Sequence, residues 1–138
     1  MPKRIFAAKL ENLSQIGAYI VQAALKAGLD DEAVYAVQLA VDEAATNIIE
    51  HGYKDVANGK IVCCCEVMDD GIKVELLDRG RQFDPDKIPE PSFDGITLEN
   101  ISPRGLGLYF IRKLMDEVRF DFSTGKGNKL TMVKKKRK

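Results

Sequence analysis

The amino-acid sequence predicts a single α+β domain, a two-layer sandwich in which helices cover one face of a mostly antiparallel sheet. Apolar residues recur at helical spacing in two long segments between residues 13 and 51. Two β-prone segments follow, joined by the turn Asp69-Asp70-Gly71, and a third helical segment precedes two more strands. The order strand, helix, helix, strand, strand, loop, helix, strand, strand is typical of this architecture.

Length and composition set the class of protein. The chain has 138 residues, of which 45% are hydrophobic and 30% are charged, so we expect one soluble globular domain over residues 1–138. No apolar run is long enough to span a membrane, and the N-terminal Met-Pro-Lys-Arg-Ile-Phe lacks the apolar stretch of a secretory signal. We therefore expect a cytoplasmic protein that does not bind membranes.

Charge and cysteine spacing argue against nucleic-acid binding and against a metal centre. The formal net charge is zero, although a basic tail ends the chain at residues 134–138 and leaves residues 1–133 acidic. A short basic terminus is usually solvated, so we expect no direct contact with nucleic acid. Cys63, Cys64 and Cys65 are consecutive and lack C-x-x-C spacing, which favours free buried thiols.

The N-terminal half predicts one strand and two helices. Residues 5–8 are β-prone, and helical spacing then runs over residues 13–25 until a glycine stops it. An aspartate at 30 or 31 can cap a second helix, which we expect to reach about His51, where Gly52 ends it.

The C-terminal half predicts a hairpin, a long loop, a helix and two strands. Strands at 60–68 and 72–76 form an antiparallel pair with one buried face. Residues 84–104 contain four prolines and little periodicity, and a loop of that length in a compact domain is usually functional. A helix at 105–115 and strands near 117–122 and 129–135 complete the sheet.

The best indication of function is the spacing of three polar residues in the second helix. Glu43, Asn47 and His51 are four apart, so a helix aligns a carboxylate, an amide and an imidazole on one stripe. A carboxylate can act as a general base, and an amide oxygen one turn away can bind Mg²⁺. Taken alone, such a stripe is more typical of the solvated face of an amphipathic helix.

Two glycine-containing motifs follow in the chain. In Asp78-Arg-Gly80, at the end of a strand, the carboxylate can accept a hydrogen bond from the exocyclic amine of adenine, and the glycine leaves room for a flat ring. Arg104-Gly-Leu-Gly-Leu108 closes the long loop and opens a helix, whose N-terminal amides can bind phosphate. Each motif alone is also typical of an ordinary turn or helix start. The second is not a P-loop, because the Lys-Ser/Thr ending is missing.

In this order the three motifs resemble those of the histidine kinase-like ATPases, which include DNA gyrase, heat-shock chaperones and mismatch-repair ATPases. Residues 43–53 are similar to their N-box, 78–83 to their first glycine box and 104–108 to their second. The pattern Val-Asp-Glu-Ala-x-Thr-Asn and the last strand are most similar to the small bacterial anti-sigma factor kinases of the RsbW and SpoIIAB type. The resemblance covers about residues 6–136 and implies a Bergerat-type ATP-binding fold with a lid at 84–104.

The resemblance also implies a role for each matching residue. Glu43 would be the general base, Asn47 the Mg²⁺ ligand, and Asp78 the adenine anchor. The other ATP-binding residues would lie close to the nucleotide: Gly80, Arg104, Gly105, Leu106, Gly107 and Thr131. His51 has a position in the motif but no expected catalytic role.

As for activity, the resemblance implies a serine/threonine protein kinase that uses ATP and Mg²⁺. It would phosphorylate an anti-sigma factor antagonist of the STAS type, bind a sigma factor, and form a homodimer. The alternative is an ATP-binding module that shapes a partner-binding surface with little or no kinase activity, and the presence of both Glu43 and Asn47 disfavours it. A histidine kinase would need an accepting histidine on a separate helix, and a gyrase-type ATPase a transducer domain, which 138 residues do not accommodate.

Overall fold

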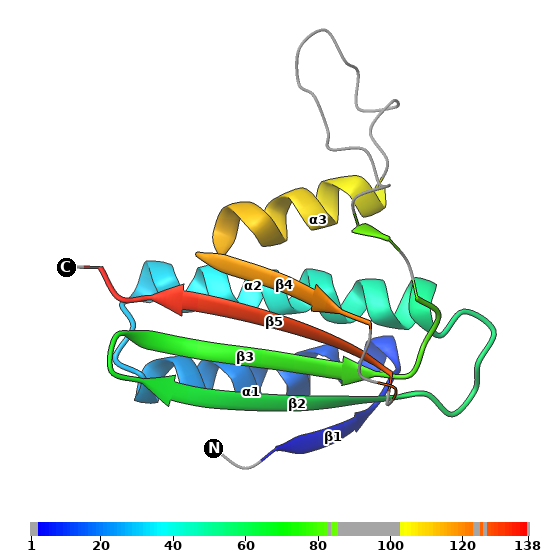
Figure 1. The fold of residues 1–138 in the computed structure, drawn as a ribbon. Helices are drawn as coiled ribbons and strands as arrows, with labels where there is room; N and C mark the ends of the chain where they lie inside the picture. Colours follow the sequence, from blue (N-terminus) through cyan, green and yellow to red (C-terminus); the bar gives the residue numbers. More distant parts are fainter. Residues whose placement is uncertain (1–2, 83, 86–102, 123–124, 126, 138) are drawn as a thin grey trace, which may run out of the picture.

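A computed structural model gives the structure of the protein and describes residues 3–82, 84–85, 103–122, 125 and 127–137. These residues form a five-stranded antiparallel sheet with helices on one face (Figure 1), which confirms the expected α+β sandwich. Most of the loop expected at 84–104 lies outside the described residues, so its function as a lid stays a prediction.

The sheet has the strand order β1-β2-β3-β5-β4, and each neighbouring pair is antiparallel. Its strands are β1 (Arg4–Ala7), β2 (Lys60–Met68), β3 (Gly71–Asp78), β4 (Glu117–Asp121) and β5 (Asn128–Lys135). Strands β2 and β3 form the predicted hairpin. Because β5 lies between β3 and β4, its first residue, Asn128, is paired with Asp78, the last residue of β3. This register brings the start of β5 to the Asp-x-Gly motif.

The helices are α1 (Leu13–Lys26), α2 (Asp31–Asn47) and α3 (Pro103–Leu114), and a short 3₁₀ helix, Leu10–Asn12, leads into α1. Helix α2 begins at the predicted aspartate cap, since the Asp30 side chain accepts a hydrogen bond of 2.8 Å from Ala33 N. Helix α3 begins two residues earlier than expected, at a proline, which is favoured in the first helical position.

The second helix does not remain α-helical up to His51, contrary to the sequence-based expectation. It ends at Asn47 and continues as a π-helical turn, Ile48–Gly52, which Tyr53 N closes by donating to Ile48 O at 2.9 Å. The wider turn changes the angular spacing of side chains, so His51 leaves the predicted stripe and is exposed, whereas Asn47 is partly buried.

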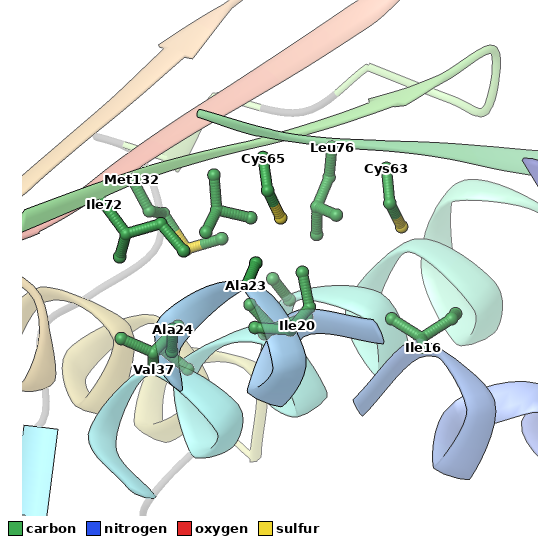
Figure 2. Close-up of a cluster of buried hydrophobic side chains, with 14 of the residues drawn as sticks. Ile16, Ile20, Ala23, Ala24, Val37, Cys63, Cys65, Ile72, Leu76 and Met132 are labelled. Atoms are coloured by element: carbon green, nitrogen blue, oxygen red, sulfur yellow. The ribbon is translucent and has the colours of Figure 1, made fainter. Parts of the chain in front are cut away.

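The core lies between the sheet and the helices. Figure 2 shows side chains of β2, β3 and β5 pointing toward those of α1 and α2. Most of the largest fully buried side chains are branched aliphatics, among them Ile16, Ile20, Val37, Ile61, Ile72 and Leu76. The sequence alternation of β2 and β3 predicted which of these residues point inward.

The consecutive cysteines follow the same alternation. Cys63 and Cys65 are buried against the helices, whereas Cys64 lies on the outer face and is half-buried. Burial raises the pKa of Cys63 to about 12 and that of Cys65 to about 11, so both thiols stay protonated and pack as small apolar groups. All three are free, as predicted. In the part of the chain that the structure describes, no helix is long and apolar enough to cross a membrane.

The basic tail contacts the domain at two residues, although the sequence predicted a solvated tail. Lys134 Nζ donates a hydrogen bond of 2.7 Å to Leu114 O, at the C-terminal end of α3, where a positive charge is favourable. Arg137 pairs with Glu32 in the first turn of α2 at 2.7 Å, although an exposed pair contributes little stability. The expectation of a solvated tail is therefore wrong for Lys134, while Lys135 to Arg137 are exposed.

Candidate functional site

Asp78, at the end of β3, is held by two donors on one of its oxygens. Gly80 N donates to Oδ1 at 2.8 Å and Asn128 Nδ2 donates to the same atom at 2.9 Å. Burial raises the pKa of the Asp78 carboxyl above its usual value, and these two hydrogen bonds lower it part of the way back. The carboxylate is thereby fixed in orientation, and it retains acceptor capacity for a bound amine.

Gly80 packs against the backbone at the end of the π-helical turn. A Cβ atom on Gly80 would lie 2.6 Å from the carbonyl carbon and oxygen of Gly52. The same carbonyl oxygen accepts a hydrogen bond of 2.7 Å from Arg81 N. The close approach that requires glycine here is thus an approach to Gly52, whereas the sequence predicted an approach to a ligand ring.

Tyr53 joins the end of this turn to the sheet. Its hydroxyl donates to Lys60 O at 2.7 Å and accepts from Arg79 N at 2.7 Å. Its ring lies under Gly59, where a Cβ atom would be only 2.5 Å from ring carbons. Tyr53 therefore fixes the position of the residue that directly follows Asp78.

Glu43 lies on the side of α2 that faces α3. A Cβ atom on Gly107 would be 3.0 Å from Glu43 Oε2, so the glycine allows the carboxylate to approach α3 closely. Burial raises the pKa of Glu43, and the negative charges of Asp42 and Glu50 raise it further. A carboxylate with a raised pKa is better suited to act as a general base near neutral pH.

Asn47 lies one helical turn after Glu43. Its Oδ1 atom is shielded from solvent and has no hydrogen-bond partner among the described residues. An unpaired buried acceptor is unfavourable, and such atoms are often partners of water, an ion or a ligand. An amide oxygen is a suitable Mg²⁺ ligand, and Mg²⁺ usually combines one or two protein ligands with water and phosphate oxygens.

No group of three or more histidine, cysteine or acidic side chains that could hold a metal ion exists within the described residues.

The glycine-rich segment lies at the N-terminus of α3, as predicted. The first turn begins at Pro103, and Gly105 is buried while Leu106 and Gly107 are partly buried. Amide groups in the first turn of a helix lack partners within the helix, and this end carries a partial positive charge that attracts phosphate. The side chain of Arg104 lies outside the described part of the structure, so its role stays a prediction.

A pocket between α2, α3 and the sheet is lined by Asn47 and Asp78, whereas Glu43 and the glycines at the start of α3 lie outside its lining. The empty space between its lining atoms is about 470 Å³ with open solvent included, but the volume that the centre of a water molecule can reach is only about 30 Å³. Its lining combines the polar side chains of Asn47, Asp78 and Asn128 with an apolar wall that includes Phe120 and Phe122. The two phenylalanine rings are nearly parallel, with centroids 6.2 Å apart and an angle of 18° between planes. Apolar walls with a few convergent polar groups are typical of sites for small organic ligands.

Comparison with known protein families agrees with this geometry. Residues 6–134 match the histidine kinase-like ATPase domain. The chain belongs to this family. The resemblance inferred from the three ordered motifs is thereby confirmed.

Within the histidine kinase-like ATPases, the chain is similar to serine-protein kinases named RsbW. It is 37% identical over 92 residues to RsbW of Bacillus subtilis strain 168, an alignment that covers 64% of this chain and 58% of that protein. It is 34% identical over 122 residues to RsbW of Bacillus licheniformis strain ATCC 14580, covering 86% of this chain and 76% of the relative. The chain therefore spans little more than half the length of the first of these relatives.

Solved structures show the same ATPase fold. The RsbU and RsbW domains of a Mycobacterium tuberculosis protein superpose with a TM-score of 0.62 at 16% identity, covering 98% of this chain and 32% of that one. A histidine kinase domain from Erythrobacter litoralis superposes with a TM-score of 0.55 at 19% identity, covering 94% and 61%. Identities this low support the fold and not a shared function.

Among the predicted site residues, Asn47 and Asp78 line the pocket, whereas Thr131 faces away from it. Thr131 is three positions after Asn128, so it points to the outer face of β5, opposite to Asn128 and Leu130. There it is paired with Glu75 on one side and Arg119 on the other. The outward direction of its side chain gives no support to the expected contact of Thr131 with adenine, which stays a prediction.

Among the lining residues that the sequence reasoning missed are Phe120, Phe122 and Asn128, together with the cationic residues Arg81 and Lys129. Asn128 had a detectable signal, since it is polar but shares the inward alternation of Leu130 and Met132. The phenylalanines had none, because an aromatic residue near the end of a strand is equally typical of an ordinary core.

Proposed function

We propose that this chain binds ATP with Mg²⁺ and transfers the γ-phosphoryl group to a serine or threonine of an anti-sigma factor antagonist. The observation that carries the proposal is the pairing of Glu43 and Asn47. One is a carboxylate with a raised pKa close to Gly107 of α3, and the other, one turn later on α2, has a buried amide oxygen with no hydrogen bond from the described residues. Similarity to the RsbW serine-protein kinases supports the same reaction.

The chemistry assigned to the chain is mainly positioning. Bound Mg²⁺ would neutralise charge on the transferring phosphoryl group, and Asn47 Oδ1 would hold the ion. The amides of the first turn of α3 would bind phosphate oxygens, while Asp78 would anchor the base at the other end of the pocket. Glu43 would accept the proton of the serine or threonine hydroxyl while the hydroxyl oxygen bonds to the γ-phosphorus and ADP leaves.

The proposal includes partners that follow from similarity to the RsbW proteins. The phosphate acceptor would be an antagonist of the STAS type, and the same chain would bind a sigma factor as a homodimer in the cytoplasm. The second candidate function is an ATP-binding regulatory module that changes a partner-binding surface without phosphoryl transfer. The presence of both Glu43 and Asn47 favours the kinase, because a module that only binds ATP needs no general base beside the metal ligand.

The first experiment separates these two functions. The purified chain is incubated with ATP labelled at the γ-position, Mg²⁺ and each STAS-type antagonist encoded by the same organism, and label on the antagonist is measured. Transfer to a serine or threonine of one antagonist is the expected result. If ATP binds but no antagonist is labelled, while a partner complex still forms, the regulatory module is the correct function.

The second experiment tests the residue roles. General-base catalysis typically contributes at least about 100-fold, so we expect Glu43→Ala to reduce transfer by that factor with the ATP Kd changed less than about threefold. Asp78→Asn should instead weaken ATP binding by about 10- to 100-fold, because a strong acceptor is lost from a buried site. Glu11→Ala is the control, since Glu11 is exposed and outside the pocket. Normal transfer by Glu43→Ala would show that the base is assigned wrongly.

A further inference from the structure

An open groove lies between α1 and α2, on the exposed side of these helices, and it shares no lining residue with the pocket between α2, α3 and the sheet. Its lining includes Leu13 and Gly17 of α1 and Tyr35, Leu39 and Asp42 of α2. The volume that the centre of a water molecule can reach in the groove is about 400 Å³, so a large side chain of another protein has room to enter. None of the residues assigned to ATP binding lines it.

Exposed apolar side chains border the groove. Tyr35 is 64% exposed, and Leu39, one turn later on the same side of α2, is only partly buried. The core needs neither of them, because α2 already buries Val37 and Val41 on its opposite side. Exposed apolar patches are typical of binding surfaces, and tyrosine is enriched among the residues that dominate the affinity of protein interfaces. The groove therefore indicates contact with another protein.

Gly17 keeps the α1 side of the groove open. It lies inside a helix and is not among the glycines with positive φ, so its backbone conformation does not require glycine. A Cβ atom on Gly17 would lie 3.6 Å from Gln38 Nε2, an ordinary contact distance, so a side chain would fit without a clash. Glycine in the interior of a helix is less favourable than alanine. Gly17 thus weakens α1 for no benefit to the free protein, as expected if a partner occupies the space.

The groove reaches the proposed general base. Leu39 and Glu43 are four residues apart on α2, which is about 6 Å along the helix, and Asp42 directly precedes Glu43. A protein seated in the groove would therefore lie within about one helical turn of the Glu43 carboxylate. A second copy of this chain in the same place would cover the base that the acceptor hydroxyl must reach. The location consequently favours the phosphoryl acceptor over a dimer partner.

The charge in the groove is negative. Asp42 is exposed, and no lysine or arginine is among the described residues that line the groove. An exposed carboxylate beside an apolar contact favours a partner that carries a lysine or arginine next to its apolar side chain, since complementary charges orient two proteins as they associate.

We propose that the groove between α1 and α2 binds the protein that accepts the phosphoryl group, by taking up an apolar side chain of that protein between Gly17 and Tyr35 and by pairing Asp42 with an adjoining lysine or arginine. The inference rests on the proposed kinase activity and extends it to recognition of the acceptor. Contacts away from the reacting hydroxyl supply binding energy that holds the hydroxyl in position at Glu43.

The test measures steady-state transfer to the STAS-type antagonist that the wild type labels, at saturating ATP and Mg²⁺, together with the Kd for ATP by calorimetry. The variants are Gly17→Met, Gly17→Ala, Tyr35→Ala, Asp42→Asn and Gln15→Met. Methionine at position 17 fills the groove, whereas alanine makes a similar backbone change and adds one methyl group. Gln15→Met introduces the same methionine at an exposed position of α1 outside the groove lining.

We expect Gly17→Met and Tyr35→Ala to raise the KM for the antagonist at least about tenfold. The kcat at saturating antagonist and the Kd for ATP should change less than about twofold, because the groove contributes binding and not chemistry. Asp42→Asn should raise the KM about two- to fivefold and reduce its dependence on salt. Gly17→Ala and Gln15→Met should match wild type. A purely structural role would instead lower kcat and ATP affinity together.

The docking site and the proposed kinase activity fail in different ways. A wild-type KM in both Gly17→Met and Tyr35→Ala refutes the docking site and leaves the kinase intact, even if these variants lose affinity for a sigma factor. If Gly17→Met does not fold, Tyr35→Ala decides, because its side chain is exposed. A rise in KM of the same size in Gln15→Met also refutes the groove. If the wild type labels no antagonist, the proposed function fails and the docking site fails with it.

Discussion

The contact between Gly52 and Gly80 allows a test in which two similar substitutions have opposite effects. In Gly80→Ala, the new Cβ would lie 2.6 Å from the carbonyl carbon and oxygen of Gly52 and 2.8 Å from its Cα. These are backbone atoms, which cannot rotate away. In Gly52→Ala, the new Cβ would lie 3.7 Å from Gly80 Cα and 3.8 Å from Asp78 Oδ1, which are ordinary contact distances.

The asymmetry sets the expected magnitudes. Overpacking a closely packed site costs about 1–3 kcal/mol, and displacing Gly52 also weakens the hydrogen bond from Arg81 N to its carbonyl, worth about 1 kcal/mol. We therefore expect Gly80→Ala to lower the free energy of unfolding by about 2–4 kcal/mol. Gly52→Ala introduces no clash, so it should leave stability unchanged or raise it by up to about 1 kcal/mol through the unfolded chain.

Urea unfolding followed by far-UV circular dichroism measures both effects, since the chain has no tryptophan to report by fluorescence. The midpoints are compared at a common slope, because neither substitution changes the surface exposed on unfolding. Gly80→Ala should also weaken ATP binding, as the shifted backbone carries a donor to Asp78. The reasoning is refuted if Gly80→Ala unfolds at the wild-type midpoint, or if Gly52→Ala is destabilised by as much.

Two further predictions concern groups that border the pocket. Tyr53→Phe removes the hydroxyl that bonds Lys60 O and Arg79 N, so it should lower the free energy of unfolding in urea by about 1–3 kcal/mol. Tyr35→Phe is the control at an exposed position and should change this free energy by less than about 0.5 kcal/mol. Equal effects would contradict the bridging role. Folding raises the pKa of Glu43, so its carboxyl stabilises the protein only at low pH and loses this contribution as pH rises. We therefore expect Glu43→Gln to raise Tm at neutral pH. A gain in Tm that persists at pH 3 would argue against this cause.

The elements that the sequence predicted well are those encoded by local pattern. The β2–β3 hairpin follows from alternation around Asp69-Asp70-Gly71, and the start of α2 follows from the aspartate cap, whose hydrogen bond the structure contains. The inward positions of Cys63 and Cys65 follow from the two-residue period of a strand. Each prediction needed only residues close together in the chain.

The features that were missed depend on contacts between distant segments. The π-helical turn after Asn47 is closed by Tyr53 N, and Tyr53 in turn is held by groups on β2 and after β3. The sequence of residues 48–52 does not by itself predict a π-helical turn. The contact of Asn128 with Asp78 depends on the strand register, which pairs two residues that are fifty positions apart in the chain. Such pairings are properties of the folded sheet.

The Gly52–Gly80 contact changes what the Asp-x-Gly motif can tell about other members of the family. Gly80 is required by the packing of the protein against itself, so a relative that has stopped binding nucleotide would still need it to fold. Asn47 differs, since its buried oxygen accepts no hydrogen bond from the described part of the chain, and an unpaired buried acceptor destabilises the nucleotide-free protein. In a sequence alignment, an altered Asn47 beside an intact Gly80 would therefore mark a chain that has kept the scaffold and given up the ligand.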